Sequence, residues 1–111
     1  MAKELKFVIL LDCYGDLLTV HQRNIMELYY CDDLSLAEIG QPLGITRQAV
    51  RSIIKRTEEL LLNYEEKLRF AERLGKMRKC FDNISAIAGK LSDEDIKNAL
   101  EKQVSDGLKL L

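Results

Sequence analysis

Residues 18–56 constrain the fold most, because their glycine, apolar and basic positions have the spacing of a helix-turn-helix motif. Ser35 followed by Glu38 forms a capping box, in which each side chain bonds a free backbone N–H at the start of a helix. Gly44 stands where a tight turn needs a residue that accepts a left-handed backbone. Thr46 can cap the next helix. The sequence therefore predicts two helices joined by a short turn.

The two faces of the second predicted helix differ in chemistry. Its apolar face repeats at helical spacing and is expected to pack inward through Val50, Ile53, Ile54 and Thr57. The opposite face is basic, and its candidate nucleic-acid-binding residues are Thr46, Arg47, Gln48, Arg51, Ser52, Lys55 and Arg56. Arginine presents a planar fork to guanine edges or phosphates, and glutamine can pair with adenine. We therefore expect Arg47, Gln48 and Arg51 to read bases. Lys55 and Arg56, further along the helix, are expected to hold backbone phosphate.

Positive charge is concentrated locally in this helix. The chain has 17 Lys and Arg against 18 Asp and Glu, a net charge of -1. Residues 47–56 carry four bases and no acid, whereas residues 1–46 carry three bases and seven acids. Because affinity for nucleic acid depends on several phosphate contacts, one copy is expected to bind weakly and in a salt-sensitive way. Two copies acting together would bind more tightly.

The length of 111 residues favours one domain. Strand signals are weak, because the β-branched residues fall inside helical periodicities, so the predicted class is all-α. We expect a single helical domain over residues 1–111, with the helix-turn-helix core at 18–56. A long-helix extension and a helical tail are expected over residues 57–111.

Two helices are predicted before the motif. The first covers Lys3–Tyr14, with Gly15 as its stop. The second opens at a capping box formed by Thr19 and Gln22 and continues to about Tyr30.

No proline or glycine interrupts the pattern between Arg56 and Gly75, so the second motif helix is expected to continue to about Leu74. At ~1.5 Å per residue it would be roughly 42 Å long. It carries an apolar stripe of Leu60, Leu61, Tyr64, Leu68, Ala71 and Leu74. Two tail helices are expected, one over Met77–Leu91 and one opened by Ser92. Either the tail folds back over the stripe or two chains pair along it, and a homodimer is favoured because it would supply a second half-site.

The first motif helix contains two residues that weaken helices, Gly40 and Pro42. Proline lacks a backbone donor and crowds the carbonyl four residues back. The helix is therefore expected to end or kink near Ile39 or Gly40.

Catalysis and cofactor binding are not indicated. His21 is the single histidine, with no nucleophile at a recognisable spacing, and there is no glycine loop for phosphate. The cysteines, at positions 13, 31 and 80, lack metal-ligand spacing and are expected to be reduced thiols. No run of 18 apolar residues or secretory signal occurs, so a cytoplasmic protein without a cofactor, metal or membrane contact is expected.

The motif region carries a resemblance to known proteins. LTVHQRNIMELYYCDDLSLAEIGQPLGITRQAVRSIIKR is similar to region 4 of bacterial sigma factors of the sigma-70 class, which has a comparable LT start, LGI turn and basic second helix. The whole chain resembles the YlxM-like family of small bacterial helix-turn-helix proteins in DDLSLAEI, GITRQAV, IKRTEELL and NYEEKL.

This resemblance implies a regulatory protein of the sigma-70 region 4 type that binds DNA. It also implies a role in the signal recognition particle pathway, because the genes of the family lie beside those of that particle. RNA as the ligand stays open. The alternative is a non-catalytic protein-interaction module that binds the GTPase of the particle, or its RNA, in place of DNA.

Overall fold

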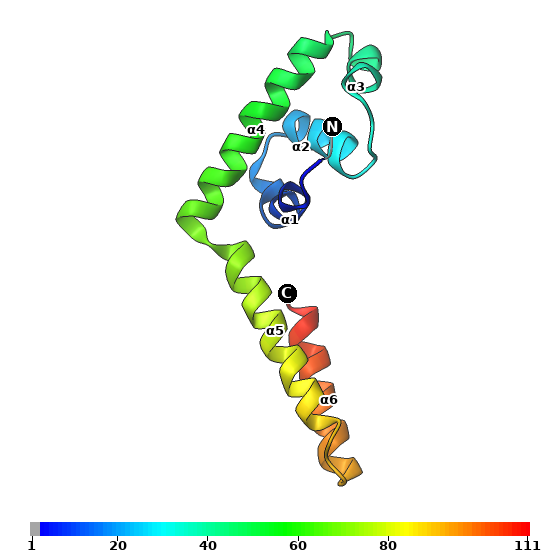
Figure 1. Ribbon diagram of the computed structural model, residues 1–111, viewed down its shortest axis with the longest axis vertical. Helices are drawn as coiled ribbons and strands as arrows, with labels where there is room; N and C mark the ends of the chain where they lie inside the picture. Colours follow the sequence, from blue (N-terminus) through cyan, green and yellow to red (C-terminus); the bar gives the residue numbers. More distant parts are fainter. Residues whose placement is uncertain (1–2) are drawn as a thin grey trace. The chain divides into compact units, whose positions relative to one another are not determined.

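The computed structural model describes residues 3–111, which form only helices and connecting turns (Figure 1). The elements are α1 (Leu5–Tyr14), the 3-10 helix η1 (Gly15–Leu17), α2 (Val20–Tyr30), α3 (Leu36–Leu43), α4 (Arg47–Leu68), α5 (Phe70–Ala88) and α6 (Glu94–Lys109). The predicted all-α class and the helix-turn-helix, formed by α3 and α4, are confirmed. The sigma-70 region 4 type stays a prediction.

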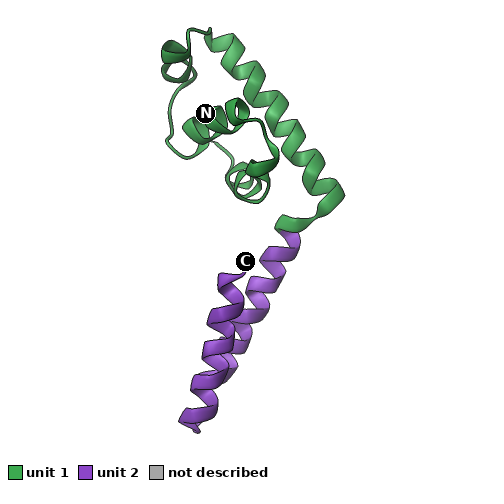
Figure 2. Cartoon of the chain, turned by 180° about the vertical axis from the view of Figure 1, so that it is seen from behind, with its two compact units in different colours: residues 1–71 green, residues 72–111 purple. Residues whose placement is uncertain are grey.

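The chain divides into two compact units (Figure 2). The first ends at Ala71 and contains α1 to α4. The second, Glu72–Leu111, is a hairpin made of most of α5 and all of α6. Residues 57–71, which the sequence analysis placed in the extension, are part of the first unit.

In the first unit, α1, α2 and α3 pack against α4. The core consists of Phe7, Leu10, Leu11, Tyr14, Leu18, Ile25, Met26, Ile39, Val50, Ile54 and Leu61. Each such side chain contributes roughly 1.5–3 kcal/mol when buried, so this core supports α4 from behind. The apolar stripe of α4 is covered here: Leu61 is fully buried, and Leu60, Tyr64 and Ala71 pack partly buried against the same core. The expectation that the tail or a second chain must cover this stripe is therefore wrong for these four residues, because the N-terminal helices do so.

Both predicted capping boxes are present. The Thr19 hydroxyl accepts from the Gln22 N–H, and the Gln22 side chain accepts from the Thr19 N–H, both at 3.1 Å. Ser35 and Glu38 make the same reciprocal pair at 3.1 Å. The hydrogen bonds from Ser35 lower the pKa of Glu38, since they favour its charged form. The starts of α2 and α3 are therefore local properties of the sequence.

The first helix ends at Tyr14 as predicted but begins two residues later than predicted. It begins at Leu5, because the Lys3 ammonium instead donates to the carbonyls of Tyr29 and Leu34 at 2.6 and 3.0 Å. Gly15 does not stop the chain in a left-handed conformation. It has a right-handed backbone with φ of -55° and continues into η1.

The prediction that α3 ends near Ile39 or Gly40 is wrong, since α3 continues through Pro42 to Leu43, and the alternative of a kink stays a prediction. Pro42 lies in the last turn, where its missing N–H removes one bond at the helix end. The end itself is closed by Gly44 at φ 69°, whose N–H bonds the Gln41 carbonyl at 3.2 Å. The Ile45 N–H bonds the Gly40 carbonyl at 3.1 Å, which completes a Schellman motif.

Gly40 has a packing role in this turn. A Cβ atom built at position 40 would lie 2.5 Å from the Ile45 carbonyl oxygen and 3.3 Å from Cγ2 of Val50. Only glycine lets the backbone of α3 approach the turn and α4 this closely.

The second motif helix is shorter than predicted: α4 ends at Leu68 and not at Leu74. Arg69 adopts a left-handed conformation with φ of 54°, and α5 begins at Phe70. The Tyr14 hydroxyl accepts the Phe70 N–H, and the Glu65 carboxylate accepts the Ala71 N–H, both at 3.0 Å. Tertiary partners therefore satisfy the first donors of a new helix at a point where the local sequence shows no break.

The second unit has a small interface between its two helices. Phe81 lies directly over Gly107, where an added Cβ would come within 2.5 Å of the ring. Among residues 72–111 only Ala88 and Val104 are buried hydrophobics. The predicted Met77–Leu91 helix is instead α5, ending at Ala88, and α6 is capped by Asp93 and not by Ser92. The Asp93 carboxylate accepts the N–H groups of Asp95 and Ile96, at 3.0 and 3.2 Å.

Candidate nucleic-acid interface

The start of α4 is held by a local cap and a buried rear face. The Thr46 hydroxyl accepts the Ala49 N–H at 3.1 Å, so the helix opens at Arg47 as predicted. Behind it, Val50, Ile54 and Thr57 are buried, and Ile53 is half-buried. The Thr57 hydroxyl donates to the Ile53 carbonyl at 2.7 Å, so this buried polar group is satisfied within the helix. The predicted inward face of α4 is confirmed.

All seven predicted site residues lie on the solvent side of the motif. Thr46, Arg47, Gln48, Arg51, Ser52, Lys55 and Arg56 are each exposed. Because the inward face is anchored in the core, the first three turns of α4 present these side chains from a rigid support. The structure brings the seven together on one surface of one helix, as the spacing predicted.

The cationic groups on this surface are not neutralised by neighbouring acids. Within residues 3–111, no carboxylate lies within 4.0 Å of the charged nitrogens of Arg47, Arg51 or Lys55. Among the described residues, the Arg56 guanidinium bonds only the Ser52 carbonyl of its own helix, through a long hydrogen bond of 3.4 Å. Exposed arginines without an acidic partner are available to an external anion.

The surface beside these residues is hollowed. One depression of about 460 Å³ is lined by Leu36, Thr46, Arg47, Gln48 and Arg51. A second, of about 270 Å³, is lined by Tyr29, Leu36, Arg51, Ile54, Lys55 and Glu58. Leu36 and Arg51 line both, so the start of α3 and the front of α4 form one continuous concave surface.

Tyr29, Leu36 and Glu58 were not predicted as site residues. Tyr29 and Leu36 looked like core positions in the sequence, and they are in fact half-buried. Glu58 is the acid nearest the basic face along α4. Burial raises its pKa, which its hydrogen bond with Tyr30 and the charge of Lys55 partly offset. Helical spacing along α4 places Glu58 one turn after Ile54, so this residue could have been predicted. Tyr29 could not, because its position beside α4 depends on the tertiary fold.

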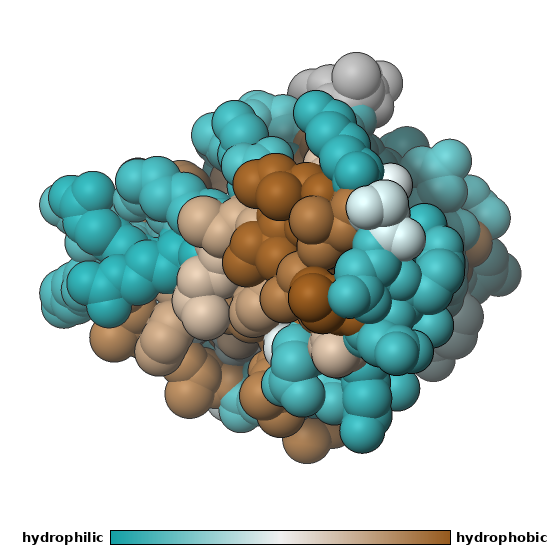
Figure 3. All heavy atoms as spheres, turned by 90° about the horizontal axis from the view of Figure 1, so that it is seen from below, coloured by the Kyte–Doolittle hydropathy of each residue, from teal (hydrophilic) through white to brown (hydrophobic). Residues whose placement is uncertain are grey.

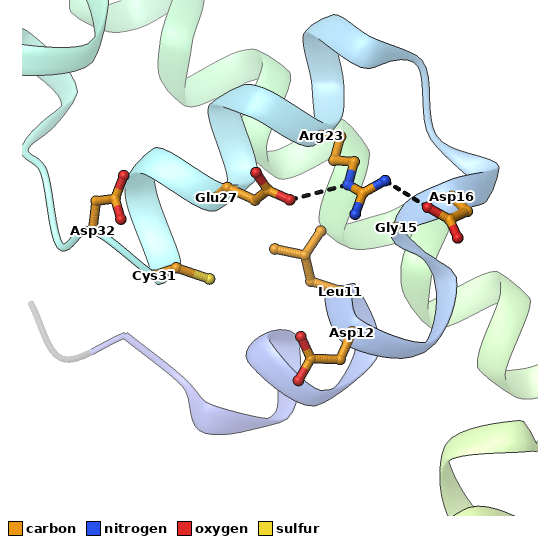
Figure 4. Close-up of a pocket in the computed structure, with 8 residues that line it drawn as sticks. All are labelled: Leu11, Asp12, Gly15, Asp16, Arg23, Glu27, Cys31 and Asp32. Carbon is orange, nitrogen blue, oxygen red and sulfur yellow. Dashed lines mark hydrogen bonds and ion pairs between the residues drawn. The ribbon is translucent and has the colours of Figure 1, made fainter. Parts of the chain in front are cut away.

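A different pocket, of about 230 Å³, lies between α1, η1 and α2 and is acidic (Figure 4). Four carboxylates line it, from Asp12, Asp16, Glu27 and Asp32. Arg23 bridges two of them, with Nε 3.0 Å from Glu27 and its terminal nitrogen bonded to Asp16. The excess of negative charge makes this pocket unsuited to phosphate, so the candidate interface is restricted to the α3–α4 side.

The same pocket contains a cysteine thiol. Burial first, and then the charges of the surrounding acids, raise the pKa of Cys31 and so favour the protonated thiol. The described residues contain no group of three His, Cys, Asp or Glu side chains arranged to hold a metal ion. None of the helices in residues 3–111 is long and apolar enough to cross a membrane.

Comparison with known proteins identifies close relatives of this chain. The sequence profile of the family described as "UPF0122: Putative helix-turn-helix protein, YlxM / p13 like" matches residues 1–104. A UPF0122 protein of Clostridium kluyveri is 53% identical over 72 residues, which span 65% of this chain and 65% of the relative. UPF0122 proteins of Listeria innocua and Clostridium perfringens are 42% and 38% identical, covering 93% and 96% of this chain and 88% and 96% of their own lengths.

Proposed function

We propose that this chain is a DNA-binding regulatory protein. The proposal starts from the fact that the chain belongs to the UPF0122 family of YlxM- and p13-like helix-turn-helix proteins. The observation that carries the proposal is the basic face of α4. Arg47 and Arg51 are exposed at the start of that helix, and no carboxylate of residues 3–111 lies within 4.0 Å of their charged nitrogens.

The residues of this face would have different tasks. The first turns of the second motif helix reach base edges in helix-turn-helix proteins. Arg47 and Arg51 would pair with guanine, and Gln48 with adenine, in the major groove. The cap at Thr46 would fix the direction in which these side chains leave the helix.

The next turn of α4 would hold the backbone. Ser52, Lys55 and Arg56 are exposed beyond the base-reading residues and would contact phosphate. Such contacts position the protein without selecting sequence. Their removal would therefore weaken binding to all duplexes alike.

The charge distribution supports binding by two copies. A net charge of -1 and an acidic pocket on the α1–α2 side oppose the four bases of α4. We propose a homodimer, because doubling the number of phosphate contacts would multiply the affinity. We also propose a cytoplasmic location and a role in the signal recognition particle pathway, which the family resemblance implies.

Fluorescence anisotropy with labelled nucleic acids tests the proposal. A random-sequence duplex at low salt should bind the wild type, and affinity should fall steeply as salt rises. The double variant Arg47→Glu, Arg51→Glu should lose binding. The control double variant Lys6→Glu, Lys67→Glu makes the same change in net charge on exposed residues of α1 and of the end of α4, away from the basic face. This control should retain most of the binding.

The ligand class is decided by competition. If unlabelled RNA of the signal recognition particle displaces the duplex more effectively than random DNA does, the ligand is RNA and the DNA proposal fails. If neither nucleic acid binds at any salt concentration, the basic face has another use. Co-elution with the targeting GTPase, unaffected by nuclease and by the arginine substitutions, would then support the interaction-module alternative.

A further inference from the structure

We infer that the α5–α6 hairpin pairs with the hairpin of a second copy in antiparallel orientation, through the exposed apolar face of each. This interface would join the two copies proposed above, but its test needs no nucleic acid. The pairing and the nucleic-acid binding can therefore fail separately.

The hairpin leaves much of its apolar surface uncovered. Only Ala88 and Val104 are buried among its 40 residues. By contrast, six large apolar side chains are between 37% and 64% exposed: Met77, Ile84, Ile87, Leu91, Ile96 and Leu100. A unit of about 40 residues with so small a core usually needs another chain to stabilise it. The hairpin therefore lacks a partner for one face.

The exposed residues share that face. On α5, Met77 and Ile84 are seven residues apart, and Ile87 lies three after Ile84, as in a heptad stripe; Leu91 follows the end of this helix. Helical geometry places this stripe beside the line of α5 that faces α6, and it places Ile96 and Leu100 on the same side of the hairpin. In the view from below, Figure 3 shows that hydrophobic residues reach the surface of the protein between hydrophilic ones.

Charge identifies the occupant as a second copy. The contact between Phe81 and Gly107 divides the hairpin into an open side and a loop side. On the open side of that level, residues 72–81 and 107–111 contain five bases and one acid. On the loop side, residues 82–106 contain six acids and three bases. Each hairpin thus has a positive open side and a longer, negative loop side.

Antiparallel pairing matches these two sides. It places the acidic loop end of one hairpin against the basic open end of the other and superposes the two apolar stripes about a two-fold axis near Phe81. Parallel pairing would oppose like charges at both ends. A twofold-symmetric contact also needs only one surface that complements itself, which this hairpin has.

Light scattering coupled to size-exclusion chromatography measures the assembly of the full chain without nucleic acid. The wild type should have twice the 12.7 kDa mass of one chain. Ile84→Glu should raise the dimer dissociation constant by about 100-fold, since the symmetric interface contains the substitution twice. The control Val20→Glu changes a residue of α2 that is 77% exposed and should leave the dimer intact. A monomeric wild type, or a dimer that survives Ile84→Glu with its helicity unchanged, would overturn the pairing.

Spin labels test the orientation and remain informative if Ile84→Glu unfolds the hairpin. Cys80 is exposed and lies next to the proposed two-fold axis. In a Cys13→Ala, Cys31→Ala background, labels on the two copies of Cys80 should lie close together. In the same background with Cys80→Ala, labels at Lys90→Cys should be about 27 Å apart along the helix axis, at ~1.5 Å per residue. Equally short distances at both positions would refute the antiparallel arrangement.

Discussion

The Tyr14 hydroxyl donates a 2.5 Å hydrogen bond to Oε1 of Glu65, a residue 51 positions later in the chain. Tyr14 is only 1% exposed, and its oxygen also accepts the Phe70 N–H. Burial and the bond with Glu65 raise the pKa of Tyr14, so the neutral phenol is retained. This pair links the end of α1 to the junction between α4 and α5.

Removing the hydroxyl should destabilise the first unit. Tyr14→Phe keeps the buried ring but deprives Glu65 and the Phe70 N–H of a partner, so the free energy of unfolding should fall by about 1–2 kcal/mol. Tyr64→Phe is the matched control. The ring centroids of Tyr64 and Tyr14 are 5.8 Å apart, but the Tyr64 hydroxyl has no hydrogen bond within residues 3–111. Urea titration followed by circular dichroism measures both. Equal losses for the two variants would contradict a role of the hydroxyl.

Gly40→Ala should lower stability even though alanine is the better helix former. Its methyl group would collide with the Ile45 carbonyl, a backbone atom that cannot move without opening the turn. We expect a loss of about 1–3 kcal/mol, typical of overpacking. Gly75→Ala, in the middle of α5 with no atom within 4 Å of the new methyl, should instead gain about 0.5–1 kcal/mol. Thermal melts compare them, and a gain at position 40 would show that the turn relaxes.

The stability of the protein should depend on pH through Glu58. Burial raises the pKa of Glu58, so the folded state keeps this proton at a higher pH than the unfolded state does. As the pH rises from the unfolded value through the folded value, the free energy of unfolding should therefore fall. Glu58→Gln removes the ionisable group and therefore this decline. Compared with the wild type, the variant should be stabilised more at neutral pH than at acidic pH. Glu59→Gln, exposed on the same helix, controls for the loss of one charge.

Base-reading and phosphate-holding residues should respond differently to substitution. Lys55→Gln should weaken binding to all duplexes uniformly and reduce the slope of log affinity against log salt by about 1. Gln48→Ala should leave that slope unchanged and alter the ranking of duplexes that differ at a single adenine. Anisotropy over a salt series and a small set of duplexes separates the two effects. A uniform loss in both variants would mean that α4 contacts only the backbone.

Local features of the chain were sufficient to predict the motif. The capping boxes at Thr19 and Ser35, the cap at Thr46 and the left-handed Gly44 each depend on residues within a few positions of one another. The inward and outward faces of α4 follow from helical periodicity alone. For this reason the seven candidate residues were found together on one exposed surface.

The extent of α3 and the packing of α2 beside it were not predicted in this way. The integrity of α3 through Pro42 depends on the Schellman bonds of the following turn, which outweigh one lost donor. The concave surface beside Arg51 requires Tyr29 from α2 as well as Leu36 from α3. Neither spacing nor propensity indicates which helix will lie beside another.

The sequence by itself determined that the chain is helical, where its motif begins and which side of α4 is basic, because helix caps and periodicity are local in the chain. Only the tertiary structure decided that α4 stops at Leu68 and that α1 and α2 cover its apolar stripe. The physical reason is that Tyr14 and Glu65, far apart along the chain, satisfy the first backbone donors of α5 only once α1 has packed against α4.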